Sequence, residues 1–316
     1  MITAPSLQKE EDLITEYFSN AFQSSFPIPS VLDSHLEEAI RHVLDHPGSL
    51  IRPRLVVQTA VAYGVETARA NDLAIALEYF HSASLLFDDL PCMDNAQERR
   101  GVPCAHLVYG EAGAILAALG LINRAYALTW RALTGSSQKR QQKAMAFVEQ
   151  SLGVDGVLNG QSLDLHYSSL PHTRETTERI ARGKTVSLIR LTVVLPAMIG
   201  DASPRELQLL DRIAVFWGLA YQVLDDLKDV LQGAESTGKT VARDLLLDRP
   251  NTAAVLGVDL AILRVKRLNS AGARALCSLR KLRSQVDHFD GLYLKLEEEL
   301  ADVCRSVPAP PAGART

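Results

Sequence analysis

The sequence predicts an all-α fold, organised as a single large helical bundle around a deep central cavity. Apolar residues recur at three- and four-residue spacing through most of the chain. Two long stretches, 108–134 and 139–167, are rich in alanine and leucine and are separated by a Gly-Ser turn. The connections are too short for the crossovers that a parallel sheet needs. The β-branched run TVVL (192–195) is also predicted as helix, because everything around it has a helical pattern.

Length and composition predict a globular chain with a large core. Of the 316 residues, 47% are hydrophobic and 22% are charged, and the formal net charge is -4. We predict one domain over residues 1–304 and a disordered C-terminal tail over 305–316, where VPAPPAGART is rich in Pro, Ala and Gly. The net charge gives no case for a nucleic-acid partner.

Neither a membrane span nor a targeting segment is predicted. No uninterrupted apolar run reaches the ~18 residues that a span needs, and the N-terminal MITAPSLQKEEDLITEY has no basic flank and no apolar signal core. The four cysteines show no paired metal-ligand spacing and are expected to stay reduced. We therefore predict a cytoplasmic location.

The first predicted elements are an amphipathic helix and a Pro-containing loop over residues 1–32. A second helix begins near Ser34, where Ser34 and Glu37 fit a capping box. Residues 46–55, HPGSLIRPRL, are predicted as a loop that carries two fixed positive charges. From residue 258 onward the pattern predicts two helices.

Two signals mark the helices in the second half of the chain. Ser203, followed by proline and by Glu206, predicts a strong helix start. Gly183 lies in the middle of a helical pattern, where glycine is unfavourable, and so predicts a kink or a close approach. Such a kink would free the carbonyl of Lys184 and expose the hydroxyl of Thr185.

The strongest functional signal is a group of carboxylates at the end of an apolar helix, in FDDLPCMDNAQERRG (87–101). Asp88 and Asp89 end the helical pattern, Pro91 interrupts it, and Asp94 follows from an irregular segment expected to turn back toward them. Because neighbouring like charges repel, a divalent cation is the obvious reason to keep them together. Oxygen-only ligands of this kind suit Mg²⁺, whose shell is completed by water and substrate phosphates.

A second group of the same kind occurs in GLAYQVLDDLKDV (218–230). Asp225 and Asp229 lie on one helix face, with Asp226 at its edge and Gln222 one turn earlier. Two such groups facing each other would hold several metal ions and bind a diphosphate.

These motifs, together with YGEAGAILAALGL, GQSLDL, GKT and GKTVARDL in this order, resemble the trans-isoprenyl diphosphate synthases, and most closely the geranylgeranyl diphosphate synthases of carotenoid-making bacteria. The likeness covers about residues 35–260. It implies an isoprenoid-synthase-type bundle, a homodimer, and three Mg²⁺ ions. It also implies a transferase that joins isopentenyl diphosphate to an allylic diphosphate, which is dimethylallyl, geranyl or farnesyl diphosphate.

The resemblance implies a role for each candidate residue. The implied metal ligands are Asp88, Asp89, Asp94, Asp225, Asp226 and Asp229. Isopentenyl diphosphate is expected to contact Arg52, His81 and Arg100, and the allylic diphosphate Arg99, Lys184 and Lys239. The residues expected beside the metal site and the ionising substrate are Gln161, Asp164, Thr185 and Gln222.

In the implied reaction the allylic carbon–oxygen bond ionises, the double bond of isopentenyl diphosphate attacks the cation, and the departed diphosphate takes the final proton. Apolar walls exclude water. Ser84 and Ala83 lie four and five residues before Asp88, ~6–7.5 Å deeper along the helix. Both are small, whereas relatives that stop at the fifteen-carbon product commonly have a bulky aromatic there. Geranylgeranyl diphosphate, with twenty carbons, is therefore the expected product.

One loop departs from the family pattern. Ser49 stands where the family has a lysine and Leu50 where it usually has an arginine, while Arg52 matches a retained arginine. Three alternatives therefore stay open: a class I terpene cyclase that uses no second substrate, a non-catalytic subunit of a synthase, and a helical Ca²⁺ or phosphate binder.

Overall fold

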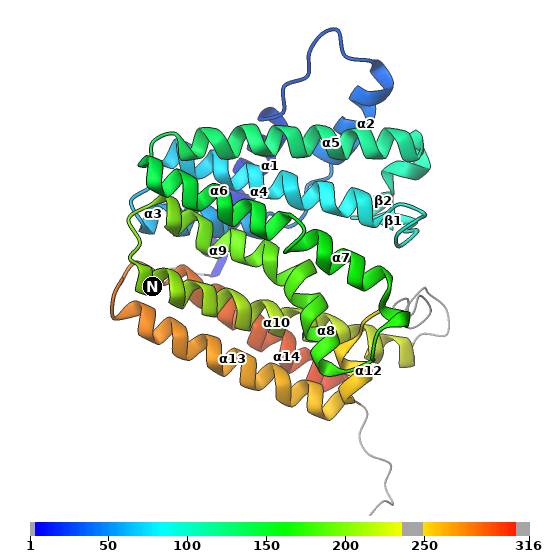
Figure 1. The fold of residues 1–316 in the computed structure, drawn as a ribbon, viewed down its shortest axis with the longest axis vertical. Helices are drawn as coiled ribbons and strands as arrows, with labels where there is room; N and C mark the ends of the chain where they lie inside the picture. Colours follow the sequence, from blue (N-terminus) through cyan, green and yellow to red (C-terminus); the bar gives the residue numbers. More distant parts are fainter. Residues whose placement is uncertain (1–3, 236–248, 308–316) are drawn as a thin grey trace, which may run out of the picture. The chain divides into compact units, whose positions relative to one another are not determined.

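The computed structural model describes residues 4–235 and 249–307, and these residues are almost entirely helical (Figure 1). The all-α prediction is confirmed. The chain divides into two compact units, a first unit of Met1–Phe147 with Leu191–Ala202 and a second unit of Val148–Arg190 with Ser203–Thr316. The prediction of one domain over 1–304 stays a prediction.

The first unit is built around helix α4 (Thr67–Asp88), which is buried on nearly all sides. Almost every residue from Leu73 to Phe80 is buried, so this helix has no polar face to turn toward solvent. It packs along its length against α5 and also contacts α3 (Figure 1). The other elements of this unit are α1 (Ala4–Ser24), α2 (Ser34–Leu44), α3 (Ile51–Ala62), the hairpin β1 (Glu98–Arg99) and β2 (Val102–Pro103), and α5 (Ala105–Leu133).

The second unit is built around α10 (Pro204–Glu235), which packs against α13 and α14 (Figure 1). Its start is the predicted capping box: the Ser203 hydroxyl accepts from the Glu206 amide at 3.3 Å, and the Glu206 carboxylate accepts from the Ser203 amide at 2.8 Å. The other elements of this unit are α7 (Val157–Leu165), η1 (Tyr167–Ser169), α8 (Arg174–Ala181), η2 (Arg182–Val186), α12 (Thr252–Leu256), α13 (Val258–Arg280) and α14 (His288–Ser306). Helices α6 (Gln138–Leu152) and α9 (Ser187–Ile199) each have residues in both units.

Two glycines allow backbone contact between α7 and η2. A Cβ on Gly160 would lie 2.3 Å from the Lys184 amide nitrogen, and one on Gly183 would lie 2.6 Å from the Gly160 Cα. Around this contact the chain forms a π-helical turn. Such turns are rare in proteins, and those that occur are often found at functional sites. The predicted irregularity at Gly183 is therefore confirmed, and its form is a π turn with a close approach.

Two predictions near the N-terminus are wrong. The N-cap of α2 is Asp33, whose carboxylate accepts a hydrogen bond from the Leu36 amide at 3.2 Å, whereas Ser34 is the first helical residue. Aspartate is as good an N-cap as serine, and the spacing alone did not separate them. Residues 51–55, predicted as loop, form the first turns of α3, with proline at a position where a helix tolerates it.

The helical pattern predicted over 139–167 is two helices rather than one. Gly153 and Gly156 lie between α6 and α7, and the Gly156 amide donates to the Gly153 carbonyl at 3.1 Å in a tight turn. Apolar periodicity continues across this turn, so periodicity alone could not reveal the break. The TVVL stretch is helical, as predicted.

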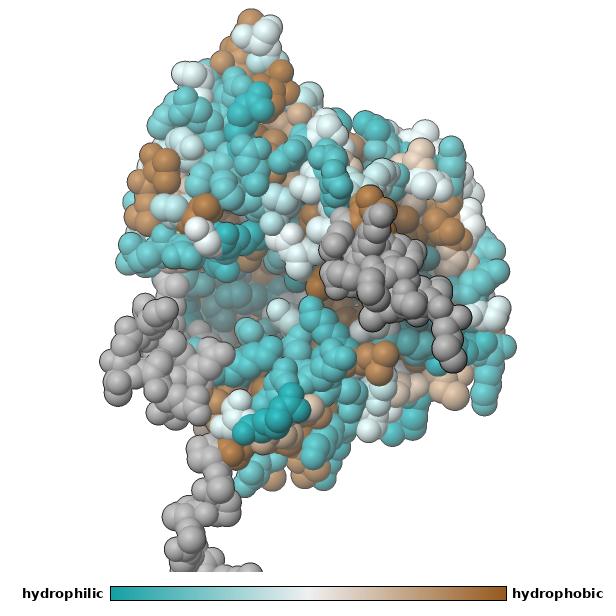
Figure 2. Space-filling model, turned by 180° about the vertical axis from the view of Figure 1, so that it is seen from behind, coloured by the Kyte–Doolittle hydropathy of each residue, from teal (hydrophilic) through white to brown (hydrophobic). Residues whose placement is uncertain are grey.

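The predicted tail overlaps the end of α14, which extends to Ser306, and residues 308–316 lie outside the described part of the chain. Helix α5 is long and apolar enough to cross a membrane by length and composition alone. Single polar residues interrupt its apolar run, so a search for an uninterrupted run misses it. One such helix is weak evidence, and α5 packs against α2 and α4. On the face shown in Figure 2 hydrophilic side chains predominate, and the hydrophobic residues form separate patches.

Candidate active site

The first aspartate motif is a turn at the end of α4. Asp88 is the last helical residue and Asp89 is the C-cap, after which Pro91 lies in a turn. The chain then returns, and the amide of Asp94 donates a hydrogen bond to the carbonyl of Asp88 at 2.9 Å. The predicted turn-back is confirmed. It places Asp88 and Asp94, both partly exposed, on one short loop.

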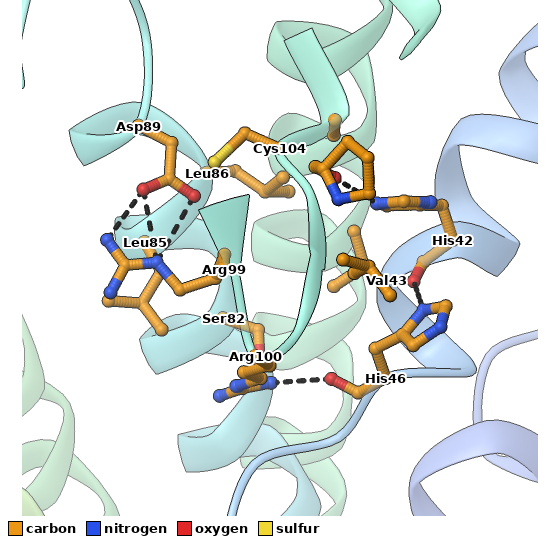
Figure 3. A pocket seen from close by; sticks show the side chains of 13 residues that line it. His42, Val43, His46, Ser82, Leu85, Leu86, Asp89, Arg99, Arg100 and Cys104 are labelled. Carbon is orange, nitrogen blue, oxygen red and sulfur yellow. Dashed lines mark hydrogen bonds and ion pairs between the residues drawn. The ribbon is translucent and has the colours of Figure 1, made fainter. Parts of the chain in front are cut away.

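Asp89, the second aspartate of this motif, is bound by an arginine. Its side chain is nearly buried, and Arg99 Nη2 lies 2.6 Å from its Oδ1 while Arg99 Nε lies 3.1 Å and 3.3 Å from its two oxygens (Figure 3). Both oxygens accept from Arg99, so a cation at Asp89 would share these oxygens with the guanidinium. The side chain of Arg99, on β1, is 40% exposed and can still meet a ligand.

Arg100, the next residue, is held by a different set of groups. Its Nη2 lies 3.7 Å from Glu78 Oε1, and its Nη1 donates to the carbonyl of His46 at 2.9 Å (Figure 3). Its backbone φ is 56°, in the left-handed region, which turns the chain between β1 and β2. A small cavity of about 40 Å³ lies beside Arg99 and Arg100 and is lined also by His46 and Ser82.

His81 lies near the same charges. Burial, reinforced by the positive charges of Arg52, Arg100 and Arg99, holds the pKa of His81 well below its ordinary value. The ring is therefore neutral at pH 7 and can donate from one nitrogen. Its buried Nδ1 has no hydrogen-bond partner among the described residues.

The loop that departs from the family pattern places its two unusual residues in different surroundings. Leu50 has a φ of 51° and its side chain is buried in the core, whereas Ser49 is exposed. An arginine at position 50 would therefore have to bury its charge or leave the core. Position 49 has room for a long side chain.

The two residues predicted to set product length differ in burial. Ala83 has no exposed surface, whereas Ser84 is partly exposed and its hydroxyl donates to the His81 carbonyl at 2.8 Å. Of the two, only the Ser84 side chain has surface that a bound chain could contact.

The second aspartate motif lies near the C-terminal end of α10. Asp225 is exposed and Asp229 is partly exposed, one turn apart. Although the side chain of Asp225 reaches solvent, partial desolvation raises its pKa, Lys228 lowers it, and Asp229 and Glu299 raise it. The two carboxylates thus repel each other across one helical turn.

Asp226 has a structural environment. It is 2% exposed, and its carboxylate accepts hydrogen bonds from Gln222 Nε2 at 2.9 Å and from the Thr252 amide at 2.7 Å. Its carbonyl accepts from Asn251 Nδ2 at 3.1 Å. Burial raises the pKa of Asp226 to about 6, against the effect of these hydrogen bonds. Asp226 therefore ties α10 to the start of α12.

The remaining candidates of the second unit gather around the π turn. Lys184 Nζ lies 3.1 Å from Asp164 Oδ2, and Arg249 lies 3.6 Å from the same oxygen. The Thr185 hydroxyl donates to Gln222 Oε1 at 2.6 Å. Buried Gln161 Nε2 has no hydrogen-bond partner among the described residues, and Lys239 lies outside them.

Comparison with known proteins identifies the family. The family description "Polyprenyl synthetase" matches residues 33–271, three quarters of the chain. The chain belongs to the polyprenyl synthetase family. It is 34% identical over 256 residues to a chloroplastic geranylgeranyl pyrophosphate synthase of Capsicum annuum, covering 81% of this chain and 67% of that one. It is 32% identical over 280 residues to the large subunit 1 of a heterodimeric geranylgeranyl pyrophosphate synthase of Arabidopsis thaliana, covering 87% and 72%.

Solved structures show the same fold. An apo FPP/GFPP synthase from Zymomonas mobilis matches with a TM-score of 0.76 at 24% identity, covering 94% of this chain and 100% of that one. A geranyltransferase from Helicobacter pylori, complexed with magnesium and isoprenyl diphosphate, matches with a TM-score of 0.74 at 23% identity, covering 97% and 98%. This polyprenyl synthetase is thus an all-α trans-prenyltransferase.

Three contacts of this polyprenyl synthetase site were missed from the sequence. The first is Glu78, whose charge in an apolar helical stretch three residues before His81 was the available signal. The second is the Asp89–Arg99 pair, because the sequence does not show which of two adjacent aspartates pairs with the arginine. The third is the anchoring of Asp226 by Thr252, which is a tertiary contact.

Proposed function

We propose that this polyprenyl synthetase condenses isopentenyl diphosphate with an allylic diphosphate to give geranylgeranyl diphosphate, with Mg²⁺ as cofactor. The observation that carries the proposal is the similarity, over most of the chain, to proteins named geranylgeranyl pyrophosphate synthases. The partly exposed Ser84, small where a bulky side chain would shorten the product, supports the twenty-carbon length.

The carboxylates fit Mg²⁺. Asp88 with Asp94, and Asp225 with Asp229, are oxygen-only pairs, and the raised pKa of Asp225 reflects burial and a repulsion that a cation would relieve. Within residues 4–235 and 249–307 no group of three or more metal-ligating side chains gathers. Two carboxylates with water and phosphate oxygens are the set that Mg²⁺ commonly takes. Bound there, Mg²⁺ neutralises charge on the leaving diphosphate.

The chain's own residues bind and orient the substrates. Lys184 has a partly exposed side chain that pairs with Asp164. It donates to the allylic diphosphate, as does Arg99. Arg52, Arg100 and neutral His81 bind isopentenyl diphosphate. The Thr185 hydroxyl, fixed by Gln222, lies beside the developing cation. The proposal also includes three Mg²⁺ ions and binding of the allylic diphosphate by Lys239.

Purified protein incubated with Mg²⁺ and dimethylallyl, geranyl or farnesyl diphosphate, with and without isopentenyl diphosphate, tests the proposal. Elongation to twenty carbons that stops when EDTA is added supports it. Hydrocarbon release without isopentenyl diphosphate would indicate a terpene cyclase, and no turnover with any substrate would indicate a non-catalytic protein. Comparing the number of bound Mg²⁺ ions with the activity tests the proposed number of three.

A homodimer is also proposed, on the basis of an exposed apolar face of α5. Residues on this face recur at spacings of four, seven and four, so they form one stripe along the helix after Gly110, where the backbone leaves helical geometry, and each is 36–59% exposed. They are Ile115, Leu119, Tyr126 and Trp130. Light scattering of the purified protein should give twice the chain mass of 34.5 kDa, and Leu119→Glu with Trp130→Glu should give monomers. The cytoplasmic location stays a prediction, tested by imaging a tagged protein.

A further inference from the structure

Glu78 is a carboxylate in the buried middle of α4. It is 2% exposed, and its neighbours Leu77 and Tyr79 are buried as well. Burial raises its pKa, while Arg52 and Arg100 lower it. A buried carboxylate is expensive unless it is paired, so its place in a core helix calls for a reason.

The partner is Arg100, and the position of that side chain is defined by three neighbours. Glu78 Oε1 lies 3.7 Å from Nη2, and the carbonyl of His46 accepts from Nη1 at 2.9 Å. The third neighbour is Gly48, where a Cβ would lie 2.7 Å from Nη2. The guanidinium is therefore enclosed by an acid, a carbonyl and a backbone without a side chain (Figure 3 shows the carbonyl contact).

Glu78 offsets the repulsion between Arg100 and the positive charges of Arg99 and Arg52. Burial lowers the pKa of Arg100, the positive charges of Arg99 and Arg52 lower it further, and Glu78 is the first of the groups that raise it. His81 is neutral and adds no charge. Since position 49 is serine, the loop itself supplies no lysine. The binding of a diphosphate here then depends on two arginines being held together.

We infer that Glu78 is a positioning residue for isopentenyl diphosphate, which holds Arg100 beside Arg52 before the substrate arrives; this inference rests on the proposed function. Glu78 does not touch the substrate. Its negative charge offsets the repulsion between the arginines in the free enzyme, and the diphosphate takes over that role on binding.

The test compares Glu78→Gln, which keeps the shape and removes the charge, with Glu78→Asp, which keeps the charge. In Glu78→Gln we expect the KM for isopentenyl diphosphate to rise about tenfold, with kcat reduced less than threefold and the KM for farnesyl diphosphate unchanged. Glu78→Asp should recover part of the loss. Calorimetric titration of isopentenyl diphosphate alone should show the same order of affinities.

Glu206→Gln is the matched control. Glu206 is another buried carboxylate paired with an arginine, Arg283 at 3.0 Å, in the second unit. This variant should lower the Tm without a selective change in either KM. An unchanged KM for isopentenyl diphosphate in Glu78→Gln, or an equal rise in both KM values, overturns the inference. If Glu78→Gln does not fold, an unchanged KM in Glu78→Asp overturns it. A wild type that does not elongate any allylic substrate overturns the proposed function instead.

Discussion

Arg99, whose side chain is partly exposed, forms an ion pair with the buried Asp89, in which Arg99 Nη2 lies 2.6 Å from Asp89 Oδ1 and Arg99 Nε approaches both carboxylate oxygens. Asp88, one residue earlier, is partly exposed and shares a loop with Asp94. Adjacent aspartates therefore have different roles: Asp89 binds an arginine and the hairpin that carries it, and Asp88 is a proposed ligand of a cation. The same division holds for Asp226 and Asp225 in the second unit.

Asp88→Ala and Asp225→Ala should each lower kcat by about 10²-fold or more, because each removes a proposed ligand of the cation that stabilises the leaving diphosphate. Incorporation of labelled isopentenyl diphosphate measures the rate. Asp72→Ala, which removes a partner of Arg131 in the first unit, is the control and should retain its rate. Near-normal rates in either motif variant would exclude the two-motif mechanism.

Asp226→Ala should act on stability. It removes the acceptor of the buried Thr252 amide and of the partly buried Gln222, and leaving a buried donor such as the Thr252 amide unpaired costs about 1–3 kcal/mol. Urea unfolding should show a lower midpoint for Asp226→Ala than for Asp225→Ala, whose side chain is exposed. Equal midpoints would mean that Asp226 does not anchor α12.

Ser49→Lys should lower the KM for isopentenyl diphosphate and leave the KM for the allylic substrate nearly unchanged. Position 49 is exposed, so the ammonium can reach solvent and a phosphate. Leu50→Arg is the contrasting variant, because it places a charge on a buried position and should lower the Tm. Steady-state kinetics and thermal unfolding decide both, and an unchanged KM would show that residue 49 does not face the diphosphate.

Ser84→Phe should shift the product from twenty to fifteen carbons, since the ring would extend from a partly exposed position. The sequence predicts the same shift for Ala83→Phe. Because Ala83 is completely buried, however, we expect Ala83→Phe to lose about 1–3 kcal/mol of stability through overpacking. Mass spectrometry of products and a thermal melt separate the two. A twenty-carbon product from Ser84→Phe would place the floor of the cavity elsewhere.

Acid should destabilise the protein through His288. Burial lowers the pKa of His288 to about 4 from 6.5, against the effect of Asp287 and Asp290. The unfolded chain therefore binds a proton more readily than the folded chain does. The part of the folding stability that depends on a neutral His288 is fully present above pH 6.5 and is lost as the pH falls toward 4. At most about 3 kcal/mol is involved. His288→Gln should flatten the stability profile in this window, whereas His166→Gln, at an exposed position, should leave it unchanged.

Local rules predicted the parts of the site that depend on neighbouring residues. The turn from Asp88 to Asp94 follows from a proline after a helix, and the capping box at Ser203 follows from side-chain reach over three residues. The pairing of Asp89 with Arg99 and of Glu78 with Arg100 depends on a hairpin folding back along α4, which no local pattern encodes. The complete burial of Ala83 could not be predicted from the sequence, because a position on a helix that is apolar all round has no unique outward face.

Gly160 and Gly183 place two backbones in direct contact, so the separation of the backbone segments that carry Asp164 and Lys184 is set by packed peptide units. Rotamers loosen gradually on warming, whereas a backbone contact persists until the helices part. We therefore expect these two backbone segments to keep their separation up to the onset of unfolding.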